Sequence, residues 1–410
     1  MAAVERVEVP AVEARERLLD FVGVVVAGLP HVRQRENAGL YVRGLVEQGG
    51  RKSLQPTLFR LEESSARYES VQQFLADSPW DPALVVQACA ERVTPGIAVE
   101  AWVLDDTGFP KQGRHSPAVK RQYSGTLGKI GNCQIGVSVH AVGSAGTAPL
   151  GWALYLPEEW CEDAERRAQA KIPASVAFKT KPELGVELAE RAAGWQVPKA
   201  PLLGDHAYGE NTALRERLHD AQLEYVLAVG PATKVFPPAT VFTAPEPAAG
   251  PGRPKSRPLP DREPETIGQL IARLADGNAQ TVSFRDGPQG EPLRSRFVFA
   301  RVHAAHNRKK ATPWPPREEW LIAEWPAGKD EPSDYWLSNL PADSAPERLA
   351  RLARMRWKIE LDYKQLKGEL GLDHYEGRSW IGWHHHTALV TVAHGFLTLE
   401  RLCPPAPRLA

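Results

Sequence analysis

The feature that most constrains the fold is a change of periodicity near residue 97, where helical patterns give way to short apolar, strand-like runs. From there the chain reads as three strands, a helix, a strand, a helix and a strand, which is the order of an α/β protein with strands in both directions. The predicted strands are Ala98–Leu104, Cys133–Val142, Pro149–Leu156, Pro201–Gly204 and Glu224–Val229, and the predicted helices are Pro182–Ala193 and Glu210–His219.

The segments on either side of this core differ in character. Residues 1–95 read as helices, predicted at Val32–Val46, Thr57–Ala66 and Ser70–Ala76, with basic connections that suit either a DNA-binding module or a plain helical cap. Residues 230–345 look like a mostly β insertion with strands at Gln280–Phe284, Arg294–Val302 and Trp320–Glu324, and with a Pro-rich loop at Ala244–Glu265. One long helix, Pro346–Leu370, is predicted to follow. The expected domains are therefore 1–95, 96–229 together with 346–402, and 230–345.

Composition excludes several classes of protein. The 410-residue chain has 50 Lys+Arg and 50 Asp+Glu, so any contact with nucleic acid must use local patches rather than a field of the whole molecule. The four cysteines are far apart and form no CxxC, which argues against a zinc ribbon or a disulfide scaffold and fits a reducing compartment. The apolar run from Phe21 to Leu29 is too short to span a bilayer, and no targeting signal is visible, so we expect a soluble cytoplasmic protein.

Acidic residues stand where α/β enzymes keep catalytic groups. Asp105 and Asp106 end one predicted strand and Asp205 ends another, while Glu360 lies on the long helix between Arg356 and Lys367. Converging carboxylates repel one another and therefore favour Mg²⁺ or Mn²⁺, and two such ions support displacement at a phosphodiester. Taken singly, an acid of this kind is more often a helix cap, part of a strand-end turn or a member of a surface salt bridge, but all three together at the ends of matching elements favour the catalytic interpretation.

A basic loop follows the first pair of acids. It carries glycines, hydroxyl side chains and one aromatic, and its five Lys/Arg are Lys111, Arg114, Lys120, Arg121 and Lys129. Such a loop suits a phosphate backbone that passes the mouth of a cleft.

Four ordered blocks of sequence resemble a known family. The blocks LDDTGFPKQG, RQYSGTLGKIGNCQIGVSVH, GDHAYGEN and RMRWKIELDYKQLKGELGLDHYEGRSWIGWHHH are similar to transposases of bacterial insertion sequences, in the insertion-sequence-four superfamily and its branch numbered seven hundred and one. The resemblance extends from about residue 33 to residue 400. It implies an RNase H-like catalytic domain with an Asp-Asp-Glu (DDE) triad, dependence on Mg²⁺, and a β-rich insertion before the last acid.

The resemblance also implies roles for particular residues. Asp105, two positions before Thr107, matches the first acid, with Asp106 as its rival, and Asp205 matches the second. The third acid is Glu360, in a motif whose arginine and lysine are Arg356 and Lys367, although Ala353 stands where the family has a tyrosine. The expected metal ligands are Asp105, Asp205 and Glu360, holding two Mg²⁺, and the expected DNA contacts are Lys111, Lys120, Arg121, Lys129, Arg356 and Lys367.

The implied activity is cut-and-paste transposition. Such an enzyme would bind double-stranded DNA at terminal inverted repeats, cut and rejoin strands, act as a homodimer, and associate with the bacterial nucleoid. Two alternatives remain open: a DNA-binding regulator that kept the fold, and a nuclease that cuts without joining.

Two groups of residues have a structural interpretation. The run His384–His386, with His394, is predicted to be structural rather than metal-binding, because adjacent residues on a helix point in different directions. The tryptophans of the insertion, which could stack on an unpaired base, are predicted to be core: Trp314, Trp320, Trp325 and Trp336.

Overall fold

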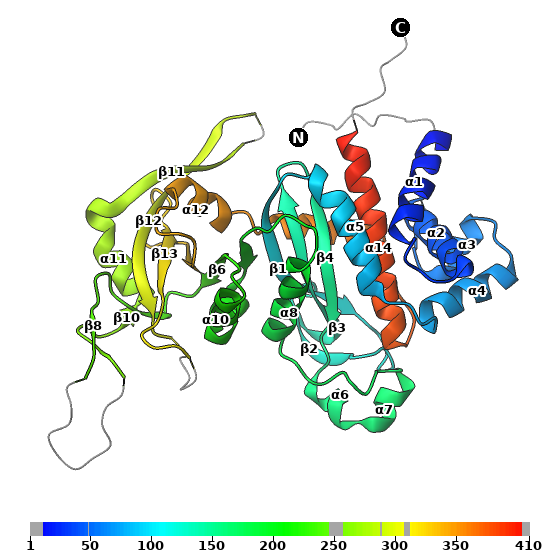
Figure 1. Ribbon diagram of the computed structural model, residues 1–410, viewed down its shortest axis with the longest axis horizontal. Helices are drawn as coiled ribbons and strands as arrows, with labels where there is room; N and C mark the ends of the chain where they lie inside the picture. Colours follow the sequence, from blue (N-terminus) through cyan, green and yellow to red (C-terminus); the bar gives the residue numbers. More distant parts are fainter. Residues whose placement is uncertain (1–10, 48, 246–256, 288, 307–311, 404–410) are drawn as a thin grey trace, which may run out of the picture. The chain divides into compact units, whose positions relative to one another are not determined.

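The structure is a computed structural model that describes residues 11–47, 49–245, 257–287, 289–306 and 312–403 (Figure 1). The chain is a mixed α/β protein with a mixed sheet, as predicted. Its contacts divide it into two compact units. Unit 1 is built from the described residues up to Glu100, from Asp105–Lys199 and from Lys358 onward, and unit 2 from Ala101–Leu104 and Ala200–Trp357.

Four strands form the sheet of unit 1. β3 lies beside β1 and pairs antiparallel with both β2 and β4. Trp152 of β4 donates from Nε1 to Thr391 on α14 at 3.1 Å, whereas its neighbour Gly151 faces Leu188 of α8. Helices thus cover both faces of this sheet at β4, and most residues of β4 and of the second half of β3 are accordingly buried and apolar. The strands are β1 (Val99–Pro110), β2 (Lys120–Ser124), β3 (Lys129–Gly143) and β4 (Thr147–Leu154).

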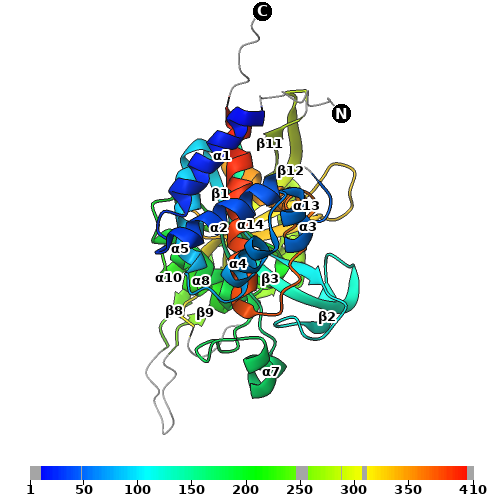
Figure 2. The same cartoon turned by 90° about the vertical axis from the view of Figure 1, so that its right-hand side faces the viewer.

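The helices of unit 1 gather around α14, which is buried along most of its length and contacts α1, α2, α4, α5 and β4 (Figure 2). The prediction of a helix at Val32–Val46 is confirmed. The predicted helix Thr57–Ala66 is wrong, because the Ser64 hydroxyl accepts from the backbone N–H of Arg67 and so begins a new helix. The helices are α1 (Ala11–Val25), α2 (Val32–Val46), α3 (Leu54–Arg60), α4 (Ser65–Ala76), α5 (Pro82–Val93), the 3₁₀ turn η1 (Thr94–Gly96), α6 (Glu158–Glu162), α7 (Ala164–Gln169), α8 (Lys181–Ala193), α13 (Lys358–Gly368) and α14 (Trp380–Leu402).

Unit 2 is dominated by strands. They are hydrogen-bonded in the order β10-β7-β12-β13-β14-β6-β5, followed by Ala101–Leu104 of β1, and β11 pairs with β12. β5 runs parallel to β1 and β6. The pairs β10–β7, β7–β12, β11–β12, β12–β13, β13–β14 and β14–β6 are antiparallel. The elements are β5 (Leu202–Gly204), α9 (His206–Gly209), α10 (Thr212–Asp220), β6 (Tyr225–Val229), β7 (Lys234–Phe236), β8 (Phe242–Thr243), β9 (Leu259–Pro260), β10 (Glu265–Thr266), α11 (Ile267–Asn278), β11 (Ala279–Asp286), β12 (Pro292–Ala304), β13 (Glu318–Glu324), β14 (Asp334–Ser338) and α12 (Pro346–Ala353).

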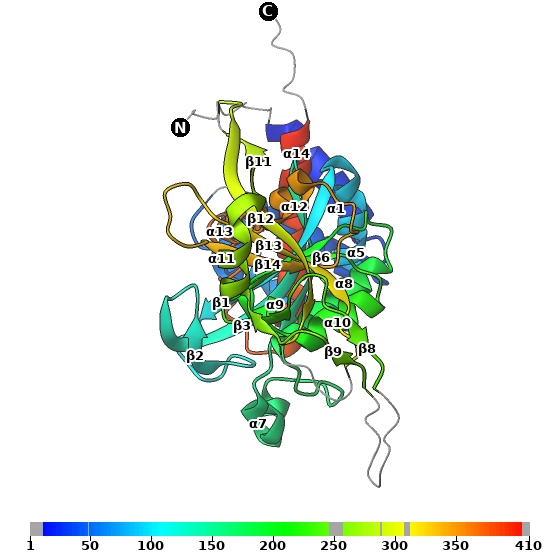
Figure 3. The ribbon, with the colours of Figure 1, turned by 90° about the vertical axis from the view of Figure 1, so that its left-hand side faces the viewer.

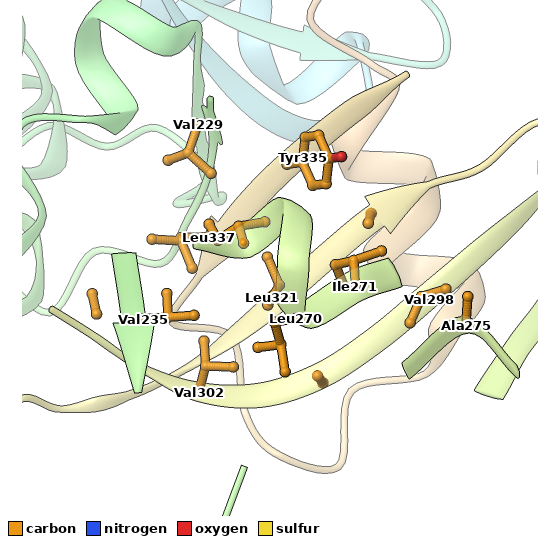
Figure 4. Close-up of a cluster of buried hydrophobic side chains, with 14 residues drawn as sticks. Val229, Val235, Leu270, Ile271, Ala275, Val298, Val302, Leu321, Tyr335 and Leu337 are labelled. Carbon is orange, nitrogen blue, oxygen red and sulfur yellow. The ribbon is translucent and has the colours of Figure 1, made fainter. Parts of the chain in front are cut away.

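The core of unit 2 lies between α11 and the middle strands (Figures 3 and 4). Leu270 and Ile271 of α11 pack against alternate residues of β12 and β13, including Val298 and Leu321. Strands occur where the sequence predicted them in the insertion, and α11 and β14 are additional elements. Residues 246–256 of the predicted Pro-rich loop lie outside the described residues, and the predicted domain limits stay a prediction.

Among the described residues, no helix combines the length and the apolar character needed to cross a membrane.

Candidate active site

The neighbouring aspartates of β1 point to opposite faces of the sheet, because side chains alternate along a strand. Asp106 Oδ2 lies 3.0 Å from Nζ of Lys181, the first residue of α8. On α13, burial raises the pKa of Tyr363, and the next contribution comes from the charge of Asp105, ahead of that of Asp106. Asp105 therefore lies on the other side of β1, toward α13, and the carboxylate of Asp106 pairs with the Lys181 ammonium. The assignment of Asp105 as a metal ligand, with Asp106 as its rival, stays a prediction.

Asp205 follows β5 directly. Its Oδ1 accepts from the backbone N–H of Ala207 at 2.9 Å and so caps the short helix α9, and none of the described cations pairs with it. In the parallel register of β1 and β5, Val103 is opposite Leu203, and Asp105 and Asp205 each come two residues later. The two aspartates therefore hold equivalent positions at the ends of neighbouring parallel pairings, where α/β proteins place their ligands.

Glu360 is exposed on α13, and the opposite side of that helix is buried. Asp362, two residues later, is only 5% exposed. Its Oδ2 accepts from Nδ1 of His140 on β3 at 2.8 Å, and its Oδ1 accepts from the Thr147 hydroxyl at 2.7 Å. Since an ionised carboxylate can only accept, the shared proton belongs on Nδ1 of the imidazole.

A second polar contact holds the same helix. The Tyr363 hydroxyl lies 2.8 Å from that of Ser138 on β3, and both groups are buried. Together with the Asp362–His140 bond, it ties the inner face of α13 to β3 and so orients Glu360 on the outer face. The sequence reasoning did not identify these residues. The available signal was the presence of Ser138 and His140 in an otherwise apolar strand.

The predicted long helix from residue 346 to residue 370 is wrong. α12 ends at residue 353, and a turn of four residues separates it from α13. In that turn the Arg354 guanidinium lies 3.1 Å from buried Glu324 on β13, which anchors the turn to the sheet of unit 2. Arg356 therefore precedes α13, and the predicted stripe of Arg356, Glu360 and Lys367 on one helix does not exist. Glu360 and Lys367 alone share α13.

Lys367 is held beside β1. Its Nζ donates to the carbonyl of Gly108 at 2.8 Å and to the Thr126 hydroxyl at 3.1 Å, and it lies 5.3 Å from the ring of Phe109. Gly108 is three residues beyond Asp105. Burial lowers the pKa of Lys367 to about 8, so this ammonium is easily discharged unless an anion approaches.

The other predicted DNA contacts lie in different surroundings. Nζ of Lys111 donates to the Tyr375 carbonyl at 2.7 Å, and burial lowers its pKa. Lys120 pairs with a glutamate of α6 at 3.1 Å. Arg121 and Lys129, in contrast, are exposed on β2 and β3. DNA binding by these residues and by Arg356 stays a prediction.

The imidazoles of the run His384–His386 contact protein groups in different directions, whereas neither ring nitrogen of the buried His394 has a hydrogen-bond partner among the described residues. The two ring nitrogens of His385 lie 2.9 and 3.0 Å from the carbonyls of Leu75 and Trp80, and Nδ1 of His386 lies 2.9 Å from the Tyr41 hydroxyl. Burial lowers the pKa of His386 to about 4. Within the described parts of the chain, no three imidazole, thiol or carboxylate side chains gather as a ready metal centre.

The tryptophans of the insertion also have protein partners. The indole N–H groups of Trp314, Trp320 and Trp325 each donate to a backbone carbonyl, at 2.7 to 2.9 Å, and Trp336 is buried. The prediction that these residues are core therefore holds for Trp336, whereas the other three tryptophans are only partly buried.

Two aspartates follow the parallel pairing of β1 and β5, and a further acid shares α13 with a partly buried lysine. Carboxylates of this kind suit the metal-dependent class of phosphodiester-cleaving enzymes. Comparison with known proteins identifies the family. The chain belongs to the DDE superfamily endonucleases, whose family model matches residues 24–291. That range includes Asp105 and Asp205 and ends before Glu360.

One relative is similar to this chain over part of its length and indicates a more specific group within the family. The "Probable transposase for insertion sequence element IS701" of Microchaete diplosiphon is 29% identical over 164 residues, which cover 39% of this chain and 40% of the relative. The two matches confirm the resemblance to insertion-sequence DDE transposases that the motifs indicated.

Proposed function

We propose that the protein is a DNA transposase that binds terminal inverted repeats, cuts DNA strands and joins their ends to a target. Asp105, Asp205 and Glu360 would be its metal ligands within an RNase H-like domain. The observation that carries the proposal is the parallel register of β1 and β5, which gives Asp105 and Asp205 equivalent positions.

The donor set suits Mg²⁺ or Mn²⁺, since both prefer carboxylate oxygens. Asp205 uses one oxygen as a helix cap, pairs with none of the described cations, and keeps its Oδ2 for a ligand. Asp105 lies on the side of α13, which carries Glu360. When bound, a pair of such ions activates the attacking water or hydroxyl and stabilises the leaving oxygen.

Basic residues would hold the DNA. Lys367 keeps its ammonium next to β1, where a scissile phosphate would raise its pKa again and be neutralised by it. Arg356 would contact a neighbouring phosphate. Because transposition acts on two DNA ends, we propose that a homodimer is the active form.

The test compares Asp205→Asn with Asp276→Asn, an exposed acid of α11, in the full-length protein. Cleavage of inverted-repeat DNA in Mg²⁺ should fall by orders of magnitude in Asp205→Asn alone, because the amide keeps the size of the side chain but not the charge that holds a cation. DNA binding, measured by fluorescence anisotropy in EDTA, should survive.

Three results would contradict the proposal. Loss of binding together with cleavage would make Asp205 structural. A wild-type protein that binds but never cuts in Mg²⁺ or Mn²⁺ would be a regulator. Cutting without strand transfer on paired ends would define a nuclease.

A further inference from the structure

The segment that follows the two aspartates of β1 is unusually basic. From Thr107 to Pro157 the sequence contains no Asp or Glu, although the whole chain is neutral. Two of the five Lys/Arg in this segment, Lys111 and Lys120, are engaged by protein oxygens. The charge that remains available includes Arg121 and Lys129, which lie on the hairpin formed by β2 and β3.

This hairpin also exposes apolar side chains. Tyr123 of β2 is directly opposite Ile130 of β3, and the two are 65% and 59% exposed. Directly opposite side chains lie about 5 Å apart at Cβ, so they form one apolar pair. Arg121 is two residues from Tyr123 and therefore shares its face of the hairpin. Neither Arg121 nor Lys129 has an acidic partner in the described part of the chain.

The turn of the hairpin is anchored to the catalytic strand. The Thr126 hydroxyl lies 3.3 Å from both the N–H and the carbonyl oxygen of Gly108 on β1, and it accepts from Nζ of Lys367 at 3.1 Å. The approach is close enough that a Cβ at position 108 would lie 2.1 Å from the Ser124 hydroxyl oxygen. At about 3.3 Å per residue, Gly108 is roughly 10 Å along β1 from Asp105.

We propose that the β2–β3 hairpin, residues 120–133, binds an unpaired nucleotide of the DNA beside the cleaved bond, an inference that rests on the proposed function. The base would stack on the ring of Tyr123 with Ile130 at its side, and Arg121, on the same face of the hairpin, would hold an adjoining phosphate. An aromatic ring beside a cation is the usual platform for single-stranded DNA. A paired base keeps its faces inside the duplex, so the exposed ring finds a base face only in an unpaired strand.

The experiment measures affinity of the full-length protein for a fluorescein-labelled dT₂₀ strand, by anisotropy in EDTA at several salt concentrations. Tyr123→Ala should weaken binding at least about fivefold, the equivalent of about 1 kcal/mol for one lost stack. Tyr123→Phe should bind like the wild type. Leu84→Ala removes a side chain of similar exposure, 57%, on α5 and should also leave the affinity unchanged.

The salt dependence of DNA binding distinguishes the contribution of charge from the contribution of base stacking. Arg121→Ala should lower the slope of log K against log[salt] by about 0.7, the value for one contact with a single-stranded phosphate. Tyr123→Ala should lower affinity without changing that slope. Ile130→Ala should weaken binding in the same way and replaces the first variant if Tyr123→Ala does not fold.

Several outcomes would overturn the inference. These are unchanged affinity in both the Tyr123 and Ile130 variants, an equal loss on a 20-base-pair duplex, and a shift of oligomeric state on gel filtration, which would make the pair an interface between copies. If the wild type cuts inverted-repeat DNA while Tyr123→Ala binds dT₂₀ normally, the inference fails and the proposed function stands. If the wild type neither binds nor cuts DNA, the proposed function itself fails.

Discussion

Asp362→Ala should strongly destabilise the protein, because Asp362 is a buried carboxylate with two hydrogen-bond partners. The Asp362 carboxylate is 5% exposed and accepts from His140 and Thr147, so its removal leaves a buried imidazole N–H without a partner. Breaking a buried pair in this way costs about 3–5 kcal/mol. For a unit of this size the loss corresponds to a Tm lower by about 6–20 °C. Glu369→Ala, an exposed position just beyond α13, should change Tm little.

The assay is thermal unfolding followed by tryptophan fluorescence, because Trp152 lies edge-on to the His140 ring at 5.5 Å and reports on this region. A double-mutant cycle with His140→Ala should give a coupling energy of about 0.5–3 kcal/mol. Additive losses, or a Tm change within 2 °C for Asp362→Ala, would refute the reasoning.

The stability difference between the wild type and Asp362→Ala should depend on pH in a predictable direction. Burial alone would raise the pKa of Asp362, but the hydrogen bond and charge of His140, helped by Thr147, outweigh it, so the pKa lies below the ordinary value. A carboxyl whose pKa is lower in the folded state stabilises the protein above its unfolded pKa, about 3.9, and loses that contribution as the pH falls further. The difference in Tm between wild type and Asp362→Ala should therefore be full at pH 7 and shrink below about pH 4.

Two other predictions concern Lys367 and Gly143. The pKa of Lys367 is lowered to about 8, so kcat/KM for cleavage should decline as the pH rises through 8 and the ammonium is lost. In Lys367→Arg the same decline should occur at higher pH. An unchanged pH profile in this variant would refute the role of the Lys367 cation. A Cβ at Gly143 would lie 1.9 Å from the Ile97 carbonyl oxygen, so Gly143→Ala should lower stability by about 1–3 kcal/mol in chemical denaturation, whereas Gly113→Ala, with open space, should be tolerated.

Periodicity was enough to place most elements of the sheet. The predicted strands of the catalytic region are all present, because a sheet covered on both faces needs apolar runs that stand out in the sequence. Local signals failed where tertiary contacts decide. The break between α12 and α13 depends on Arg354 reaching Glu324, some 30 positions earlier in the chain, which no helical period records. The strand β2 was hidden in a Gly-rich basic loop because its pairing with β3, rather than its own composition, forms it.

For the site, spacing identified candidate acids but not what surrounds them. The sequence Asp105–Asp106 does not show which carboxylate pairs with Lys181 and which lies toward α13, because that depends on the orientation of the strand. Likewise, a lysine at position 367 reads as an exposed cation, whereas packing against Gly108 and Phe109 partly buries it and lowers its pKa.

Because several N-terminal helices pack on α14, they cannot reach their final packing until α14 has been synthesised. This helix supplies the surface on which α2, α4 and α5 pack, yet it starts at residue 380, almost 290 positions after α5 ends. At about 5–20 residues per second, the ribosome needs roughly 15–60 s to make the intervening chain. During that time the nascent N-terminal helices lack their main partner. A chain that stops before residue 380 therefore lacks the helix on which α2, α4 and α5 pack, and its N-terminal helices have no surface to fold against.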